Sequence, residues 1–451
     1  MSRDTQTLTH RTPAFVWGYN NTGGLGLGHT ARAYQPVPTS LPPDVVDVQG
    51  GVEFTVALTR AGEVHTWGGN EAGQLGTPDV RTRRTPARLE LPGGARARAI
   101  AVGTDHVLVL TRSGNLLAWG SNHWGQLGDG TTEDRHQPVR IRTREIASIA
   151  AGNAISVAVT RRGDVLTWGR NNHGQLAQSS EAEREVHTPT AARLPRGTQV
   201  RAVDAGRHHL VVLTETGRLL SFGLDGFGHA APSELHLKSA WGRVRSISAG
   251  DEFTLALTNR HVLLGWGQNL NGQLGQGDTL ARVHPTAITL PRADGHVIDL
   301  QAGARSATVL TSAHEVFTWG ETRMGQGGNG QADDNQLKPR RVASLRQERV
   351  RSLHGGAHHT VLTAKHGSAV GLLVTPAVAT ARPGQAVSYR VHEVDKFGTD
   401  LGPTHHRVSL QIVDGEAVGR TVRAHTLGTH RVTARADKLT GTASLLIKKD
   451  Q

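Results

Sequence analysis

Residues 67–76 read WGGNEAGQLG and residues 119–128 read WGSNHWGQLG, so one ten-residue pattern stands twice with its tryptophans 52 positions apart. Related stretches recur along most of the chain, each opening on an aromatic residue followed by Gly. Regular recurrence of this kind indicates a repeat protein in which every copy forms one supersecondary unit. The aromatic anchors of the seven copies are Trp17, Trp67, Trp119, Trp168, Phe222, Trp266 and Trp319.

A second motif alternates with the first, as in GGVEFTVALT at 50–59 and AGDEFTLALT at 249–258. Short alternating runs flank Gly-containing turns such as RAGE at 60–63, which is typical of β-hairpins. One more extended segment precedes each AG, and another usually carries a proline, which suits an edge strand. Four short strands per copy predict the blades of a β-propeller. We expect the aromatic anchors to be structural wedges between blades.

The two motifs are out of phase at the ends of the repeat region. The first anchor has no AG strand before it, and the last such strand, 355–363, has no WG after it. The N-terminal strand is therefore expected to complete the final blade. The predicted fold class is all-β, with a seven-bladed propeller over residues 1–365 closed by the N-terminal strand and a C-terminal β-sandwich over residues 366–451.

The repeat, approximately AGxxHTxxLTxxGxVxTWGxNxxGQLG, resembles that of the regulator of chromosome condensation family over residues 13–363. The family's namesake is an exchange factor for the small GTPase Ran and also binds chromatin. Its β-wedge and basic N-terminal tail have no clear equivalent here, because the repeats are evenly spaced and the tail holds only Arg3 and Arg11. A plant ultraviolet-B photoreceptor of this architecture uses tryptophans at positions where this chain has none. A third relative inhibits a β-lactamase through one face.

The resemblance places seven residue pairs, one after each AG, on loops around the central axis. Their charges are unevenly distributed, which favours a docking face for a protein partner because complementary charge sets specificity and association rate. A solvated polar rim is the alternative interpretation. The charged candidates are Glu53, Asp105, Asp251 and Glu252 among the acids and Arg207, His208, Arg305 and His358 among the bases.

Large apolar residues stand in the NxxG loops that follow the anchors. Such residues are common anchors of protein interfaces when they are exposed. Burial against a neighbouring loop is the alternative. The apolar candidates for partner binding are Trp124, Phe227, Leu270 and Met324.

Catalytic, cofactor and metal chemistry is not expected. The GGLGLG stretch at 23–28 is the first copy of the GQLG element, with no predicted helix after it to bind phosphate. By resemblance, His106, His209 and His359 make structural hydrogen bonds, and adjacent histidines on a strand point to opposite faces and chelate poorly. The chain has no cysteine. We therefore expect no cofactor, no metal and no enzyme.

Composition leaves the compartment open. A net charge of +12 is spread along the chain, so a nucleic acid partner is permitted and only weakly supported. The sequence has no apolar run long enough for a membrane span and no secretory signal at its start. A cytoplasmic protein is the default expectation, with non-Sec export or a phage particle as alternatives.

After residue 365 the repeat stops and short strand runs with turn signals follow. VTPAVATARPGQAVSYRV and DKFGTDLG resemble segments of bacterial immunoglobulin-like domains, which implies a small β-sandwich. The whole chain is therefore interpreted as a non-enzymatic protein-binding propeller joined to such a module. The alternatives are an exchange-factor-like regulator of a small GTPase, and a structural or adhesive component of a bacterial surface or phage particle.

Overall fold

The computed structural model describes residues 11–178, 184–224, 233–332, 335–365, 371–397, 400–404, 406 and 408–448. The fold of these residues is all-β, and the only helical elements among them are three short 3-10 turns. The chain divides into two compact units. One unit comprises residues 15–37 and 44–364, and the other comprises 1–14, 38–43 and 365–451. The 3-10 turns are η1 (Pro92–Gly94), η2 (Ser239–Trp241) and η3 (Ala343–Leu345).

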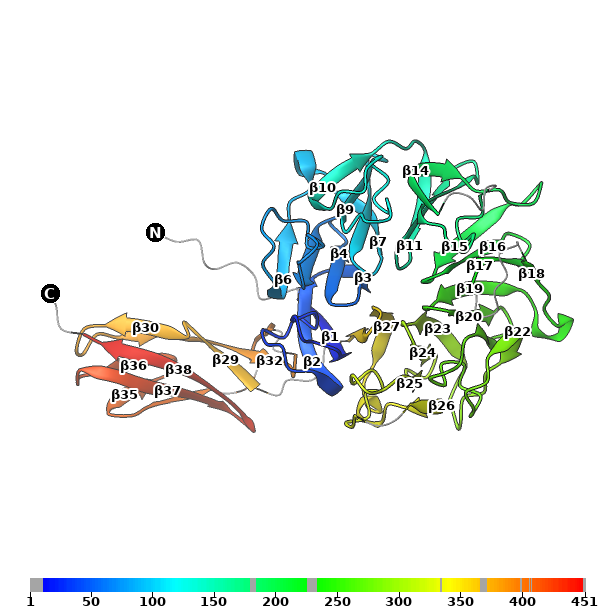
Figure 1. Cartoon of the computed structure of the whole chain (residues 1–451). Helices are drawn as coiled ribbons and strands as arrows, with labels where there is room; N and C mark the ends of the chain where they lie inside the picture. The colour runs from blue at the N-terminus through cyan, green and yellow to red at the C-terminus, as the bar shows by residue number, and fades with distance from the viewer. Residues whose placement is uncertain are drawn as a thin grey trace. The chain divides into compact units, whose positions relative to one another are not determined.

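The repeat region forms five separate four-stranded antiparallel sheets, which follow one another around a common centre (Figure 1). In order across each sheet, the strands are β10 (Arg135–Ile141), β9 (Leu116–Gly120), β8 (His106–Thr111) and β7 (Ala97–Val102); β11 (Ile146–Ala151), β12 (Ile155–Thr160), β13 (Val165–Arg170) and β14 (Glu185–Ala191); β15 (Val200–Ala205), β16 (His209–Thr214), β17 (Leu219–Gly223) and β18 (Ser233–Leu235); β19 (Val244–Ala249), β20 (Phe253–Thr258), β21 (Leu263–Gly267) and β22 (Arg282–Ala287); β23 (Val297–Ala302), β24 (Ser306–Thr311), β25 (Val316–Gly320) and β26 (Gln336–Arg341).

A further sheet has eight strands. Its two four-stranded halves join at a single parallel pair, Gly355 with Gln49, so each half has the size of the other sheets. Strand β1 lies between β2 and β28 in this sheet, although the two flanking strands are far apart in the sequence. The strands in order are β2 (Ala33–Pro43), β1 (Arg11–Gly18), β28 (His359–Ala364), β27 (Val350–Gly355), β3 (Val45–Gly50), β4 (Phe54–Thr59), β5 (Val64–Gly68) and β6 (Arg83–Leu89).

The two middle strands of each of the five four-stranded sheets, and β4 with β5 in the eight-stranded sheet, form the hairpin that the sequence predicts. In the β4–β5 hairpin Phe54 pairs with Gly68 and Leu58 with Val64. Most of the outermost strands carry a proline, and the β9–β10 register shifts between Arg135 and Val139, on either side of Pro138. A proline lacks an N–H donor, so the edge of a sheet tolerates it best.

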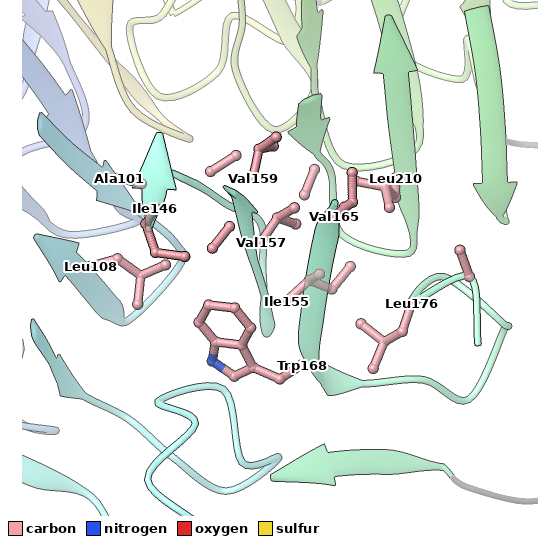
Figure 2. Close-up of a cluster of buried hydrophobic side chains, with 14 of the residues drawn as sticks. Ala101, Leu108, Ile146, Ile155, Val157, Val159, Val165, Trp168, Leu176 and Leu210 are labelled. Atoms are coloured by element: carbon pink, nitrogen blue, oxygen red, sulfur yellow. The ribbon is translucent and has the colours of Figure 1, made fainter. Parts of the chain in front are cut away.

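The tryptophan anchors join neighbouring sheets. Trp67, Trp119 and Trp168 are fully buried, and the indole Nε1 of each donates to a backbone carbonyl of the preceding repeat at 2.8–2.9 Å. Figure 2 shows Trp168 packed in an apolar cluster that includes Ile155 and Val157. Among the described residues Trp266 Nε1 has no partner. An indole wedge thus combines apolar burial with one hydrogen bond that fixes its orientation.

Buried histidines also cross from one sheet to the next. His106 Nε2 lies 2.9 Å from Ser156 Oγ, His209 Nε2 lies 2.9 Å from Thr254 Oγ1, and His359 Nε2 lies 2.8 Å from Thr55 Oγ1. Burial lowers the pKa of His106 to about 3 and is the main cause that lowers the pKa of His209 to about 4. These rings are therefore neutral structural groups.

A central channel runs between the innermost strands of the sheets and has a volume of about 310 Å³. Polar side chains on these strands brace neighbouring sheets along the channel. Asp204 Oδ2 accepts a hydrogen bond from Ala249 N at 2.9 Å, and Gln49 Oε1 accepts one from Val102 N at 3.1 Å. The channel is lined by residues of β3, β7, β11, β15, β19, β23 and β27.

The second compact unit has an apolar core of its own, which includes Tyr389, Val391, Val422 and Leu445. Two segments of the N-terminal third, residues 11–14 and 38–43, group with this unit, which the sequence did not predict. Its three sheets, in strand order, are β29 (Gly371–Thr375), β32 (Arg390–Val394) and β33 (Asp400–Pro403); β30 (Val378–Ala381), β38 (Leu439–Ile447), β37 (Gly428–Ala436) and β34 (Ser409–Ile412); β31 (Val387–Ser388), β36 (Thr421–Ala424) and β35 (Gly415–Val418).

Candidate protein-binding loop face

Two sets of loops lie at the same end of the sheets, because antiparallel strands alternate in direction. The first set includes residues 51–53 between β3 and β4, 103–105 between β7 and β8, and 206–208 between β15 and β16. The second set lies one hairpin further along each sheet, as between β9 and β10, and carries the NxxG motifs. We call this end the loop face. All charged candidates from the sequence, and the apolar candidates Trp124, Leu270 and Met324, belong to these two sets.

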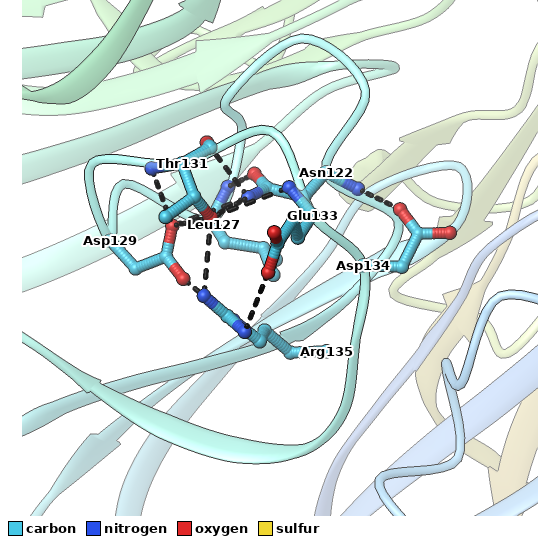
Figure 3. Close-up of polar contacts among 7 residues, drawn as sticks. All are labelled: Asn122, Leu127, Asp129, Thr131, Glu133, Asp134 and Arg135. Atoms are coloured by element: carbon cyan, nitrogen blue, oxygen red, sulfur yellow. Dashed lines mark hydrogen bonds and ion pairs between the residues drawn. The ribbon is translucent and has the colours of Figure 1, made fainter.

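The NxxG loops are held by their own asparagine. Asn122 Oδ1 accepts a hydrogen bond from Leu127 N at 2.9 Å, and its Nδ2 donates to Thr131 O at 2.9 Å. Arg135 closes the same loop through Asp129 at 2.7 Å (Figure 3). Asparagines at the same repeat position accept from Leu25 N, Leu75 N, Leu176 N and Leu274 N. The asparagine is thus a scaffold residue, a role that the sequence analysis missed although its recurrence was visible.

One sector of the loop face is acidic. Glu53 is half-buried and accepts a hydrogen bond from Tyr19 Oη at 2.9 Å. Burial, followed by the charges of Glu53, Asp134 and Glu71, raises the pKa of Asp105 to about 6. The structure therefore brings the predicted residues Glu53 and Asp105 together with Asp134 and Glu71, which the sequence analysis did not select.

The next sector is cationic. The Arg170 guanidinium lies 4.6 Å from the ring centre of Trp124, and the rings of His173 and His208 are 4.9 Å apart. Burial and the charge of Arg207 lower the pKa of Arg170. Arg170 and His173 were not among the predicted residues, because charged candidates were taken only from the pairs that follow each AG.

Carboxylates of the following sheet border the cationic sector. Glu252 Oε1 lies 3.2 Å from His208 Nδ1, and Asp251 Oδ2 lies 4.0 Å from Arg207 Nη1. Burial raises the pKa of Asp251 to about 6 against the lowering effect of Arg207 and other charges. The Arg207–Asp251 contact is a partly exposed ion pair, which contributes little to stability and leaves its charges accessible.

The remaining charged candidates stand further around the ring. Arg305 is exposed. His358 is half-buried, its ring meets Tyr19 edge to face at 6.3 Å between centres, and burial is the main cause that lowers its pKa. The structure thus places all eight predicted charged residues on the loop face without joining them into one cluster.

The apolar candidates differ in exposure. Leu270 is 71% exposed, whereas Trp124 and Met324 are half-buried. Phe227 lies outside the described residues. Leu280, in the same loop as Leu270, is 66% exposed and was missed by the sequence analysis. Other copies carry Arg81 or Glu133 at the position of Leu280, and this contrast was the available signal.

In the part of the chain that the structure describes, no three histidine, aspartate or glutamate side chains gather closely enough to hold a metal ion. Likewise, no helix in this part of the chain has the length and apolar character needed to cross a membrane.

These sheets, anchors and loops define a β-propeller protein built from tandem repeats. The model of the regulator of chromosome condensation (RCC1) repeat matches residues 14–58, 61–110, 113–159, 162–213, 261–310 and 313–363. The chain belongs to this family. A second model of the repeat matches five segments, and two of them, 200–228 and 244–273, extend into the gap at 214–260 left by the first. That gap contains Phe222, the anchor of the copy that departs most from the pattern.

Curated relatives carry the same region. The chain is 32% identical over 346 residues to the ultraviolet-B receptor UVR8 of Arabidopsis thaliana, covering 73% of this chain and 77% of the receptor. It is 29% identical over 378 residues to the human E3 ubiquitin-protein ligase HERC2, covering 80% of this chain and 7% of the ligase. The chain thus spans only a small part of the ligase.

Solved structures show the same fold. Human WBSCR16 matches with a TM-score of 0.70 and 23% identity, over 78% of this chain and all of the other. Prp20p of Saccharomyces cerevisiae, described with its binding properties to Gsp1p and histones, matches with a TM-score of 0.69 and 22% identity, over 80% of this chain and 93% of the other. At these identities the likeness establishes the fold alone.

Proposed function

We propose that this protein is a non-enzymatic propeller scaffold that binds a protein partner through its loop face. The observation that carries the proposal is the separation of charge on that face, with an acidic sector around Glu53 and Asp105 beside a cationic sector around Arg170 and Arg207. Such a pattern orients an incoming partner and rejects wrong ones. Exposed leucines at positions 270 and 280 add apolar contact area.

Relatives support protein binding as the general activity. The Prp20p structure is described with binding to Gsp1p and histones, and another structure holds the yeast protein bound to Kap60. Regulation of a small GTPase is the second candidate, favoured by the description of Prp20p. Ultraviolet reception is not proposed, because the pair positions after each AG hold no tryptophan.

We further infer a ring of seven blades closed by the N-terminal strand, and a C-terminal immunoglobulin-like module that serves as a spacer or a second binding element. The order β2-β1-β28-β27 supports closure, because β1 supplies a strand to the sheet that begins at the other end of the repeat region. Full burial of Val391 and Val432 in a separate apolar core supports the module.

The test is partner capture from the source cells with the intact chain, followed by crosslinking and mass spectrometry. Arg305→Glu/Leu270→Glu changes two exposed residues of the loop face, and we expect it to release the captured protein. Arg60→Glu/Arg161→Glu is the matched control at the opposite end of the sheets, and it should retain that protein. Crosslinks that map to the control end, or equal retention by both variants, contradict the proposal.

A further inference from the structure

Two arginines and two histidines of the loop face gather where the β11–β14 sheet meets the β15–β18 sheet. Arg170 ends strand β13, His173 follows in its NxxG loop, and Arg207 and His208 stand in the loop between β15 and β16. The charges of His173, Arg170 and Arg207 all act on His208 and, after burial, lower its pKa, while Glu252 raises it. We call these four residues the cationic pocket.

Two donors of the cationic pocket are unused. The Nε atoms of Arg170 and Arg207 are buried, and among the described residues neither has a hydrogen-bond partner. A buried donor without an acceptor costs free energy, and each such group in a folded protein calls for an explanation. The side chain of Arg207 is nevertheless 40% exposed, so its outer nitrogens remain open to a ligand.

The pocket is held in shape before any ligand arrives. Arg170 lies against the face of Trp124, and the His173 and His208 rings rest against each other. Glu252 reaches His208, and Asp251 approaches Arg207 only to 4.0 Å. Within the described residues, neither carboxylate hydrogen-bonds to a guanidinium of the pocket. Preorganised cations reduce the entropy that a partner loses on binding.

We propose that the cationic pocket receives the carboxylate of an acidic side chain from the protein partner, with Arg170 and Arg207 as the recognition residues. This inference rests on the proposed function and names the chemistry of its site. A carboxylate is planar and accepts two parallel hydrogen bonds from a guanidinium, so it fits these arginines. A nucleic acid fits less well, because Arg170 already covers the Trp124 face that a base would stack on.

The experiment measures fluorescence anisotropy of a labelled short oligo-glutamate peptide with the full chain at low ionic strength. We expect Arg207→Gln and Arg170→Gln to weaken binding by about tenfold or more, the size expected for a charge-assisted hydrogen bond. Arg32→Gln is the matched control, because Arg32 also covers a loop-face ring, that of Tyr19 at 5.1 Å, but its Nε has an acceptor in Asn21 at 3.2 Å. The control should change affinity by less than about twofold, since its charge lies outside the pocket.

Three outcomes would overturn the proposal. They are equal binding of an oligo-glutamine peptide, equal effects of Arg207→Gln and Arg32→Gln, and tighter binding of single-stranded DNA that the same variants abolish. Light scattering of the free chain tests a fourth outcome. If the chain is a dimer that Arg207→Gln dissociates, the occupant is a second copy, and this result would contradict a separate partner. If cell capture succeeds while oligo-glutamate shows no discrimination, the loop face stands and only the pocket assignment fails.

Discussion

His209 shows how one position of the repeat serves either an apolar or a polar role. It occupies the place that Phe54 and Phe253 hold in other copies, since all three pair with the glycine after the anchor. The imidazole bonds to Thr254 across the gap between sheets, whereas the phenyl rings only pack. A polar group in this place is stable only while it is neutral.

The His209→Phe substitution should therefore change how stability depends on pH. The folded state keeps His209 neutral down to about pH 4, whereas the unfolded chain takes up a proton near pH 6.5. The histidine's contribution is fully present above pH 6.5 and is lost as the pH falls toward about 4. Relative to wild type, the variant should gain about 1.4 kcal/mol for each pH unit in that window.

Urea unfolding above and below pH 6.5 measures this difference. The comparison with wild type is necessary because Asp105, Asp204 and Asp251 have raised pKa values. These three carboxyl groups make the fold more stable as the pH falls, whereas His209 makes it less stable. His284→Phe, on the exposed surface of β22, is the control and should show a constant difference. A pH-independent difference for His209→Phe would refute the assignment.

Glycine after the anchor is required by both conformation and space. Gly120 has φ +99°, and a Cβ there would lie 2.3 Å from Asp105 O. Gly114 in the same sheet has φ +84° with nothing within 4 Å of its Cβ position. Gly120→Ala should therefore reduce the free energy of unfolding by about 2 kcal/mol more than Gly114→Ala, because only the first adds a clash to the left-handed strain. Equal losses in chemical denaturation would show that the contact relaxes without cost.

At the scale of elements, strand β1 is the feature with the largest expected effect. Trp17 Nε1 donates to Gln326 O at 2.9 Å, and Tyr19 N donates to His358 O at 3.0 Å, so residues near the start of the chain bond to residues more than three hundred positions away. Removing such a strand exposes an edge and an apolar interface together.

Deletion of residues 1–20 should lower the melting temperature far more than an ordinary tail deletion. Differential scanning calorimetry measures the effect, and a deletion that stops before Arg11, where β1 begins, is the control. Melting of the longer deletion at the wild-type temperature would show that β1 does not close the ring.

At the scale of the whole molecule, the ring brings short loops from successive repeats to one end and gives each sector its own charge. The repeat supplies the same backbone to every loop, while the side chains differ from copy to copy. Partner specificity on such a surface depends on the order of the copies around the ring rather than on any single loop.

The sequence by itself determined the repeat, the hairpins, the anchors and the family. Periodic patterns such as the recurrent Trp-Gly pair report local strand and turn preferences, and those preferences act in every copy alike. Charged candidates such as Arg207 and Asp105 followed from the same register, because a loop position in one copy implies its place in all others.

Only the tertiary structure decided which side chains meet. Arg170 and Arg207 come from neighbouring sheets, and their shared pocket depends on how these two sheets pack. Likewise, Trp124 is half-buried under Arg170 while Leu270 is exposed, although both stand in NxxG loops. Burial, orphaned donors and shifted pKa values arise from contacts between segments distant in the sequence, and a local pattern carries no information about those contacts.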